Sequence, residues 1–330
     1  MLKIFGMGAR KSQLLVLLAA VLCSSVAIAQ RTPVVLDTDI GSDIDDAFAV
    51  AMIMQSKQLD LKAVTTVTGD AQARARIVAK MLTLGGMGSV PVAAGASDPK
   101  PAFAQARWAD GFTGADLVSQ PAVQLLKQAI DKEHGRMVVI AIGPLTNIAA
   151  LLAQMPDARK KIREIVLMGG SIARGYTPGS GPTPEYNIAE DAGAAQAVFA
   201  SGIPIRMAPL DVTARLQMDE PHRQQIFALH TPLTDALEAL YQLWGQPTPT
   251  LHDPMAVSVL MDPSLCQTKR MHVDIEKNGM TRAGQKGSPN ATVALETDPA
   301  QFINYYVSLF TSPTRTSQSR NSSAAEESSY

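Results

Sequence analysis

The sequence predicts a single α/β domain in which helices flank a central, mainly parallel β-sheet. Short β-branched runs alternate with helical patterns along most of the chain, and such alternation implies right-handed crossovers between parallel strands. Apolar residues make up 46% of the 330 residues, enough for a large core, whereas aromatic residues make up only 5%. This aliphatic composition favours helix-on-sheet packing over an aromatic-rich β-sandwich and excludes global disorder.

Strands are expected where apolar, often β-branched residues stand together and end at glycine, proline or a charged residue. The clearest is the run over residues 137–142, which Gly143 and Pro144 end. Helices are expected where apolar residues recur at helical spacing, as over residues 71–84, whose basic residues Arg74, Arg76 and Lys80 are assigned to the solvent face. The predicted strands are 34–36, 63–67, 137–142, 165–168, 203–208, 270–275 and 291–295. The predicted helices are 47–54, 71–84, 145–154, 189–200, 220–229, 233–243, 254–260 and 299–310.

The first 29 residues predict a secretory signal peptide. Three basic residues and no acid accompany an apolar run over residues 14–23, and the segment ends in the sequence AIA at residues 27–29. A basic start, an apolar centre and an Ala-x-Ala end are the parts of such a signal. An uncleaved anchor helix is the alternative, but this apolar run is short for a bilayer that requires about 20 residues. We therefore expect cleavage after Ala29 and a secreted or periplasmic protein.

Charge and cysteine content exclude several classes of partner and of stabilisation. The net charge of −1 becomes −4 once residues 1–29 and their three basic side chains are removed. A chain with this net charge has no strong positive electrostatic potential that would bind nucleic acid or, after cleavage, an anionic membrane. Cys23 leaves with the signal, so the remaining Cys266 cannot form an internal disulfide and is expected to be a small buried side chain. The Ser/Thr-rich residues 313–330 are expected to be disordered, which leaves residues 30–312 as the folded domain.

Five aspartates lie within ten residues directly after the first predicted strand: Asp37, Asp39, Asp43, Asp45 and Asp46. Ligands of parallel sheets bind beyond the carboxyl ends of the strands, where this loop stands. Like charges packed so closely repel one another, so the group must be protonated or hold a cation. Oxygen ligands select Ca²⁺ or Mg²⁺, and no CxxC or HExxH motif offers a zinc site. Taken singly, Asp37 and Asp43 are equally well explained as helix caps or turn formers.

Five ordered segments resemble the inosine–uridine preferring nucleoside hydrolase family. VVLDTDIGSDIDDAFAV at residues 34–50 resembles its DxDxGxDDAxA signature, with a loop two residues longer. The other segments are AIGPLTNIA at 141–149, IVLMGG at 165–170, PEYNIA at 184–189 and LHDPMA at 251–256. The match extends over about residues 33–310. The resemblance implies a nucleoside hydrolase-like fold with a Rossmann-like core, and an enzyme that cleaves the N-glycosidic bond of ribonucleosides to give free base and ribose.

The resemblance also implies a role for each matching residue. A Ca²⁺ ion would be held by the carboxylates of Asp39, Asp46 and Asp253 and by the backbone carbonyl of Ile142. Asp39 would act as general base toward the metal-activated water, and His252 would protonate the departing base. The substrate contacts carried over are Asp45, with Asp43 as the alternative in the longer loop, and Met168, Glu185 and Asn187. Relatives are commonly dimers or tetramers, so a homo-oligomer is expected.

Departures from the family pattern leave parts of the site open. Asp70 stands where family members have asparagine, an insertion lengthens residues 174–183, and a family histidine is replaced within residues 107–111. Asn147 is expected to bridge a turn rather than touch a ligand. Trp108, Tyr241 and Trp244 are candidates to stack on a nucleobase, although core or surface packing explains each equally well. The preferred base is not predicted by these segments.

Two other functions compete with hydrolysis of nucleosides. A haloacid-dehalogenase-like phosphatase also places a DxD motif after its first strand, but it requires Thr or Val where this chain has Gly41, and it does not explain the HDP and EYN segments. An exported protein that binds ribose or a nucleoside without turnover would use the cation and sugar site only as a receptor. The presence of both Asp39 and His252 favours the hydrolase.

Overall fold

The first strand shows why this chain forms a sheet that is buried on both faces. In the computed structural model, which describes residues 30–98, 100–284 and 287–312, Thr32–Thr38 (β1) divides its side chains between two hydrophobic cores. Val34 and Leu36 pack into one core, whereas Val35 packs into the other. A parallel strand covered by helices on both faces requires such a continuous apolar run.

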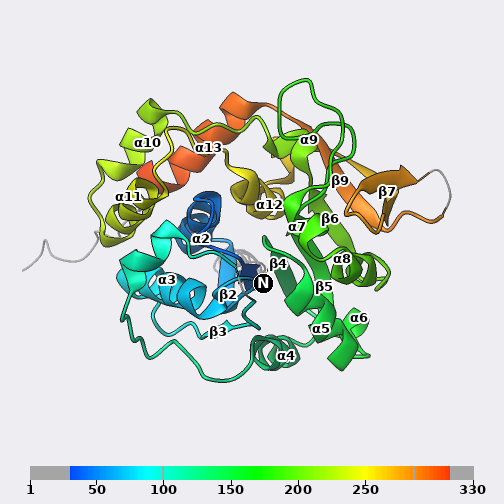
Figure 1. Cartoon of the computed structure of the whole chain (residues 1–330), viewed down its shortest axis with the longest axis horizontal. Coiled ribbons are helices and arrows are strands. Elements are labelled where there is room, and N and C mark those ends of the chain that lie inside the picture. Colours follow the sequence, from blue (N-terminus) through cyan, green and yellow to red (C-terminus); the bar gives the residue numbers. More distant parts are fainter. Residues whose placement is uncertain (1–29, 99, 285–286, 313–330) are drawn as a thin grey trace, which may run out of the picture. The chain divides into compact units, whose positions relative to one another are not determined.

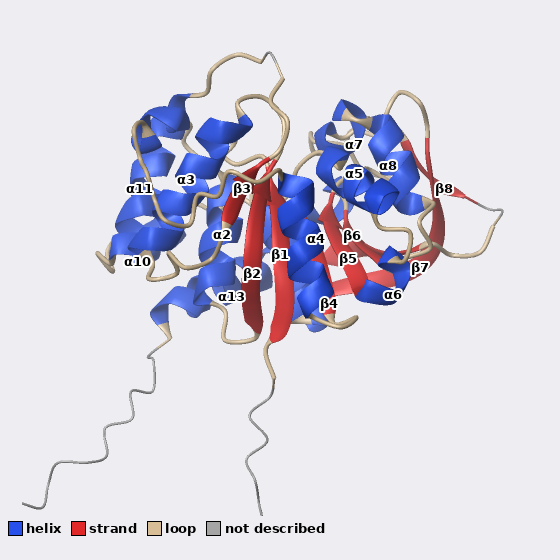
Figure 2. Ribbon diagram, turned by 90° about the horizontal axis from the view of Figure 1, so that it is seen from below, coloured by secondary structure: helices blue, strands red, loops and turns tan. Residues whose placement is uncertain are grey.

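The described strands form one mixed, mainly parallel sheet. They are Thr32–Thr38 (β1), Leu59–Thr66 (β2), Val92–Ala94 (β3), Met137–Ala141 (β4), Ile162–Met168 (β5), Ile205–Ala208 (β6), Cys266–Ile275 (β7), Thr281–Gly284 (β8) and Ala291–Thr297 (β9). Their order is β3-β2-β1-β4-β5-β6-β9-β7-β8, and only β7 pairs antiparallel, with β9 and β8. The chain moves outward from β1 to β3 and then returns to β4, so the strand order reverses between β1 and β4 (Figure 2). Such a switch point opens a crevice at the carboxyl ends of the strands.

Helices cover both faces of the sheet (Figure 1). They are Asp45–Gln55 (α2), Ala71–Leu84 (α3), Ala122–Lys132 (α4), Thr146–Gln154 (α5), Ala158–Lys161 (α6), Tyr186–Glu190 (α7), Ala192–Phe199 (α8), Leu210–Thr213 (α9), Glu220–Phe227 (α10), Pro232–Trp244 (α11), His252–Met261 (α12) and Pro299–Thr311 (α13), with 3₁₀ turns at Ala104–Ala109 (η1) and Pro263–Leu265 (η2). One core holds apolar residues of α2, α3 and α10 to α13, and the other holds those of α4, α5 and α8. Among the described helices, none is long and apolar enough to span a membrane.

The structure confirms the predicted fold class and contains every predicted strand and helix, with shifted ends. The predicted helix 189–200 is in fact two helices, because Asp191 leaves the helical conformation and its side chain caps α8 at the backbone N–H of Ala194. Sequence patterns missed the short strands β3 and β8 and the helices α4, α6 and α9. Cys266 is buried and unpaired, as predicted. The predicted signal peptide (1–29) and Ser/Thr-rich tail (313–330) lie outside the described residues.

Candidate active site

A cavity of about 400 Å³ at the carboxyl ends of β1, β4 and β5 brings together residues of all five motif segments. Every residue to which the family resemblance gave a catalytic, metal-binding or substrate-binding role lines it. These residues are Asp39, Asp43, Asp45, Asp46, Ile142, Met168, Glu185, Asn187, His252 and Asp253. Their separation along the chain is large, so the crossovers of the sheet are what assemble the site.

The acidic loop leaves β1 through a tight turn at Gly41, whose φ of +114° is disfavoured for any residue with a side chain. A Cβ atom there would also lie 2.5 Å from the ring of Phe103. The loop then enters α2, whose first residues Asp45 and Asp46 are buried at the helix N-terminus, where the helix dipole favours negative charge. The hydroxyl of Thr38 donates a hydrogen bond to Asp46, which fixes that carboxylate against the strand end.

Arg74 holds the acidic loop in place, and its assignment to the solvent face of its helix is wrong. Only 2% of Arg74 is exposed. Its guanidinium donates hydrogen bonds to the backbone carbonyls of Asp39 and Ile40 and to the hydroxyl of Ser42. It also lies over the ring of Phe103, 4.5 Å from the centroid. A buried cation is tolerated because its donors are used and carboxylates lie nearby.

Asp45, Asp46 and Asp253 form the tightest acidic cluster in the described part of the chain. One carboxylate oxygen from each lies within 4.8 Å of the others, and all three residues are buried. Burial and mutual repulsion raise the pKa of each carboxyl well above its usual value. Within the described ranges none of the three forms an ion pair with lysine or arginine, and the nearby charge of Arg74 only partly offsets the repulsion at Asp46, so the cluster favours protonation or a bound cation. The oxygen-only donor set fits a hard divalent ion.

The acidic cluster shares only two of its three residues with the predicted set of metal ligands. Asp46 and Asp253 belong to both. Asp45, which the resemblance made a ribose ligand, lies in the cluster, whereas Asp39 lines the same cavity outside it. The carbonyl oxygen of Ile142 accepts a hydrogen bond from Asn187 Nδ2 across 3.2 Å.

Glu185 and Asn187 are fixed in the same cavity by the N-terminus of α7. Glu185 caps this helix, since its carboxylate accepts hydrogen bonds from the backbone N–H groups of Asn187 and Ile188. A third bond, 2.8 Å from the N–H of Gly170, ties Glu185 to the end of β5. Burial nevertheless raises the pKa of Glu185 to about 7. The side-chain amide of Asn187 also donates to the carbonyl of Met168, so these predicted substrate ligands hold one another in place.

His252 is the first residue of α12, directly before Asp253. Its Nδ1 lies 2.8 Å from the hydroxyl oxygen of Thr213 on α9. The ring of Tyr176 meets the His252 ring edge-on at 6.1 Å. Burial lowers the pKa of His252 to about 4, so the ring is neutral at neutral pH.

Several candidate residues lie outside the cavity. Asp70 caps α3 at the N–H of Ala73, and Trp108 packs under the ammonium group of Lys80. Tyr241 packs at tilted angles against its aromatic neighbours Phe227 in α10 and Trp244 in α11, whereas Trp244 does line the cavity. Asn147 does not line this cavity, and it does not bridge a local turn as expected: its amide donates to Asp37 Oδ1 on β1 and to the carbonyl of Thr66 on β2.

Sequence reasoning missed two exposed aromatic residues at the cavity, Tyr176 and Tyr186. The hydroxyl oxygen of Tyr176 accepts a hydrogen bond of 2.8 Å from the backbone N–H of Tyr186. Tyr176 stands in the lengthened segment 174–183 and Tyr186 in the EYN segment, so their positions next to recognised motifs were the available signal. Ser42 and Gln246 complete the lining.

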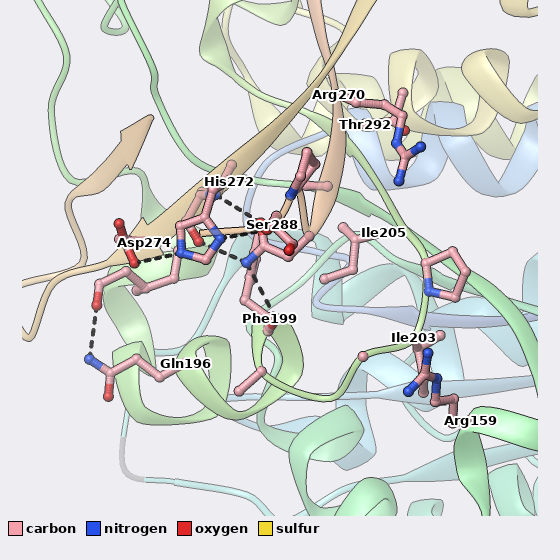
Figure 3. A pocket seen from close by; sticks show the side chains of 18 residues that line it. Arg159, Gln196, Phe199, Ile203, Ile205, Arg270, His272, Asp274, Ser288 and Thr292 are labelled. Carbon is pink, nitrogen blue, oxygen red and sulfur yellow. Dashed lines mark hydrogen bonds and ion pairs between the residues drawn. The ribbon is translucent and has the colours of Figure 1, made fainter. Parts of the chain in front are cut away.

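A larger cavity of about 760 Å³ lies at the opposite ends of the parallel strands, around the amino ends of β6 and β9. Figure 3 shows Arg159 and Arg270 at one end of it and the His272–Asp274 pair at the other, with Ile203 and Ile205 in the wall between the arginines. His272 is already bound to Asp274 and to the carbonyl of Ser288. Among the residues that line this cavity, Asp274 is the only acidic one, and none belongs to the five motif segments.

The inosine-uridine preferring nucleoside hydrolase family model matches residues 34–304. The chain belongs to this family. The pyrimidine-specific ribonucleoside hydrolase RihA of Citrobacter koseri is 32% identical over 306 residues, covering 82% of this chain and 96% of the relative. RihA of Escherichia coli O9:H4 gives the same values. The predicted family is thereby confirmed, and this nucleoside hydrolase is an N-glycosidase by membership.

Solved structures confirm the fold of this nucleoside hydrolase. The plant nucleoside hydrolase PpNRh1 superposes with a TM-score of 0.75 at 24% identity, covering 86% of this chain and 100% of that one. A purine-preferring ribonucleoside hydrolase from Gardnerella vaginalis superposes with a TM-score of 0.69 at 26% identity, covering 84% and 98%.

Proposed function

We propose that this protein hydrolyses the N-glycosidic bond of ribonucleosides in a Ca²⁺-dependent reaction that releases free base and ribose. The observation that carries the proposal is the convergence in one cavity of a buried acidic cluster, a second carboxylate and amide pair, and a histidine. A phosphatase that resembles it only in the DxD loop would have no use for Glu185, Asn187 or the HDP segment.

The residues that would hold Ca²⁺ are Asp46 and Asp253, with Asp39 and the carbonyl of Ile142 from the predicted set and Asp45 from the acidic cluster. When bound, the ion would orient ribose hydroxyls and make a water molecule more acidic. The remaining chemistry falls to the side chains around it.

Asp39 is the proposed general base. Burial raises its pKa to about 6, while the nearby positive charge of Arg74 opposes the rise. A carboxyl with that pKa is ionised at neutral pH yet basic enough to accept a proton from an attacking water, which is what general-base catalysis requires.

The other residues serve the sugar and the leaving group. Departure of the base makes the ribose oxocarbenium-like, and carboxylates held close to it stabilise the developing positive charge. Glu185 and Asn187 would bind ribose hydroxyls, and Met168 would pack against the sugar. His252 would donate a hydrogen bond from the N–H group of its neutral ring to the departing base, where negative charge accumulates.

Release of ribose from a panel of nucleosides tests the proposal. The panel includes both purine and pyrimidine nucleosides, because the relatives above are named for opposite preferences. We expect turnover by the wild-type protein and its loss in Asp39→Ala. Tight nucleoside binding without turnover would instead establish a receptor.

We propose two further properties from the sequence. Export with cleavage after Ala29 follows from the composition of residues 1–29. A homo-oligomer follows from the family resemblance, and light scattering coupled to size-exclusion chromatography tests it.

A further inference from the structure

We infer that Thr213 is a positioning residue that sets the tautomer of His252, so that the ring presents an N–H group to the cavity. The inference rests on the proposed function in one respect: the N–H group contributes to catalysis only if a departing base accepts its hydrogen bond. Thr213 belongs to none of the five motif segments, and it comes to the site from the short helix α9, 39 residues before His252.

The hydroxyl of Thr213 has one available partner. Thr213 is fully buried, with 0% of its surface exposed. Its oxygen lies 2.8 Å from Nδ1 of His252, and the described residues offer it no other hydrogen bond. A buried hydroxyl that donates nothing loses its hydration without compensation. The Thr213 hydroxyl therefore donates its proton in the hydrogen bond to Nδ1, and Nδ1 is the acceptor.

The direction of this bond decides where the histidine keeps its own proton. A neutral imidazole has one N–H donor and one acceptor nitrogen. If Nδ1 accepts from Thr213, the proton is on Nε2. Nε2 has no protein partner in the described chain, and it is not among the buried atoms that lack one. Since His252 lines the cavity, Nε2 faces the space where the substrate would lie.

The opposite tautomer would be useless to a departing base. With its proton on Nδ1, His252 would present a bare nitrogen to the cavity and repel the lone pairs of the leaving group. The Thr213 hydroxyl thus selects the donor form without touching the substrate. The ring of Tyr176 also packs against the imidazole, with an angle of 74° between the two ring planes.

Two substitutions of Thr213 separate the hydroxyl from the shape of the side chain. Thr213→Val keeps the volume and removes the donor, and Thr213→Ser keeps the donor. For an ordinary nucleoside we expect kcat to fall about 10-fold or more in Thr213→Val and to recover in Thr213→Ser, as part of the ~10²–10⁴-fold that general-acid help supplies. For nitrophenyl riboside, whose leaving group needs no proton, both variants should match the wild type.

Thr234→Val is the matched control, because it removes an equally buried threonine hydroxyl from α11 at a position that does not line the cavity. It should leave kcat on both substrates unchanged. Equal losses on both substrates in Thr213→Val, or no recovery in Thr213→Ser, would overturn the inference.

Nitrogen-15 NMR of histidine-labelled protein reads the tautomer without any turnover. The His252 signals are assigned by their absence in His252→Ala. We expect the Nε2–H form in the wild type and a mixture of both forms in Thr213→Val. An Nδ1–H form in the wild type would refute the inference. A wild-type protein that cleaves no nucleoside would refute the proposed function, and the NMR result would still decide the tautomer.

Discussion

The backbone N–H of Asp253 donates a hydrogen bond to Oδ2 of Asp45 across 3.3 Å, joining residues that lie 208 positions apart. This bond connects the N-terminus of α12 to that of α2, so two helix N-termini and their acidic residues meet at one point. Negative charge at a helix N-terminus is favourable, which partly offsets the repulsion among the carboxylates. Because of the remaining repulsion, we expect the cation to bind at this point.

Asp253→Asn should weaken binding of Ca²⁺ and of ribose together. The substitution keeps the backbone N–H but removes one of the three clustered charges, and the affinity of an oxygen site for Ca²⁺ depends on the number of charged ligands. Titration calorimetry with Ca²⁺ and then with ribose measures both effects. Asp60→Asn, at a half-buried residue of β2 that is paired with Lys62 and does not line the cavity, is the control and should change neither affinity.

His252→Ala should spare calcium binding and reduce turnover. We expect kcat on an ordinary nucleoside to fall by ~10²–10⁴-fold, the usual range for general-acid help. The loss on nitrophenyl riboside should be much smaller, because that leaving group departs without a proton. Equal losses on the two substrates would assign His252 a binding or structural role.

Removal of calcium should lower thermal stability, and the effect should grow with pH. Protons compete with the cation for Asp45, Asp46 and Asp253, whose pKa values are raised, so binding strengthens as pH rises. At a Ca²⁺ concentration 100 times Kd, binding adds about 2.7 kcal/mol to the free energy of unfolding. Scanning calorimetry with and without chelator at pH 5.5 and 7.5 measures the difference. An equal shift at both values would contradict the competition.

Glu185→Gln should flatten the pH dependence of stability in calcium-free protein. The pKa of Glu185 is raised from 4.5 to about 7 in the folded state, so the folded protein holds a proton that the unfolded chain releases. Its contribution is complete below pH 4.5 and is lost as pH rises through 7, a change of about 3 kcal/mol. Denaturant unfolding across this window should show a shallower decline in the variant, whatever the absolute stability of either protein. Parallel curves would exclude Glu185 as the source.

The secreted protein should begin at Gln30. N-terminal sequencing of material recovered outside the cytoplasm gives the result directly. Retention of Met1 in that material would refute the predicted cleavage.

The amino-acid sequence alone predicted the fold class and the residues that line the candidate site. The alternation of short apolar runs with helical patterns is local, because backbone periodicity depends on neighbours within a few positions. The five aspartates from Asp37 to Asp46 predicted a cation site for the same reason, although the Asp37 carboxylate instead accepts hydrogen bonds from Thr65 and Asn147 and does not line the cavity. The ordered motif segments then named His252, Asp253 and Glu185, and all of them line one cavity.

The tertiary structure alone decided how these residues are held. Polarity placed Arg74 in solvent, yet the acidic loop, lying 32 to 35 positions away, supplies the acceptors that permit its burial. Thr213 has an ordinary sequence context and gains its role only because α9 packs beside the start of α12. Hydrogen-bond partners across such separations depend on how helices and strands pack, which no local pattern encodes. The sequence by itself therefore determined which groups serve this site, and packing determined their orientation, burial and protonation.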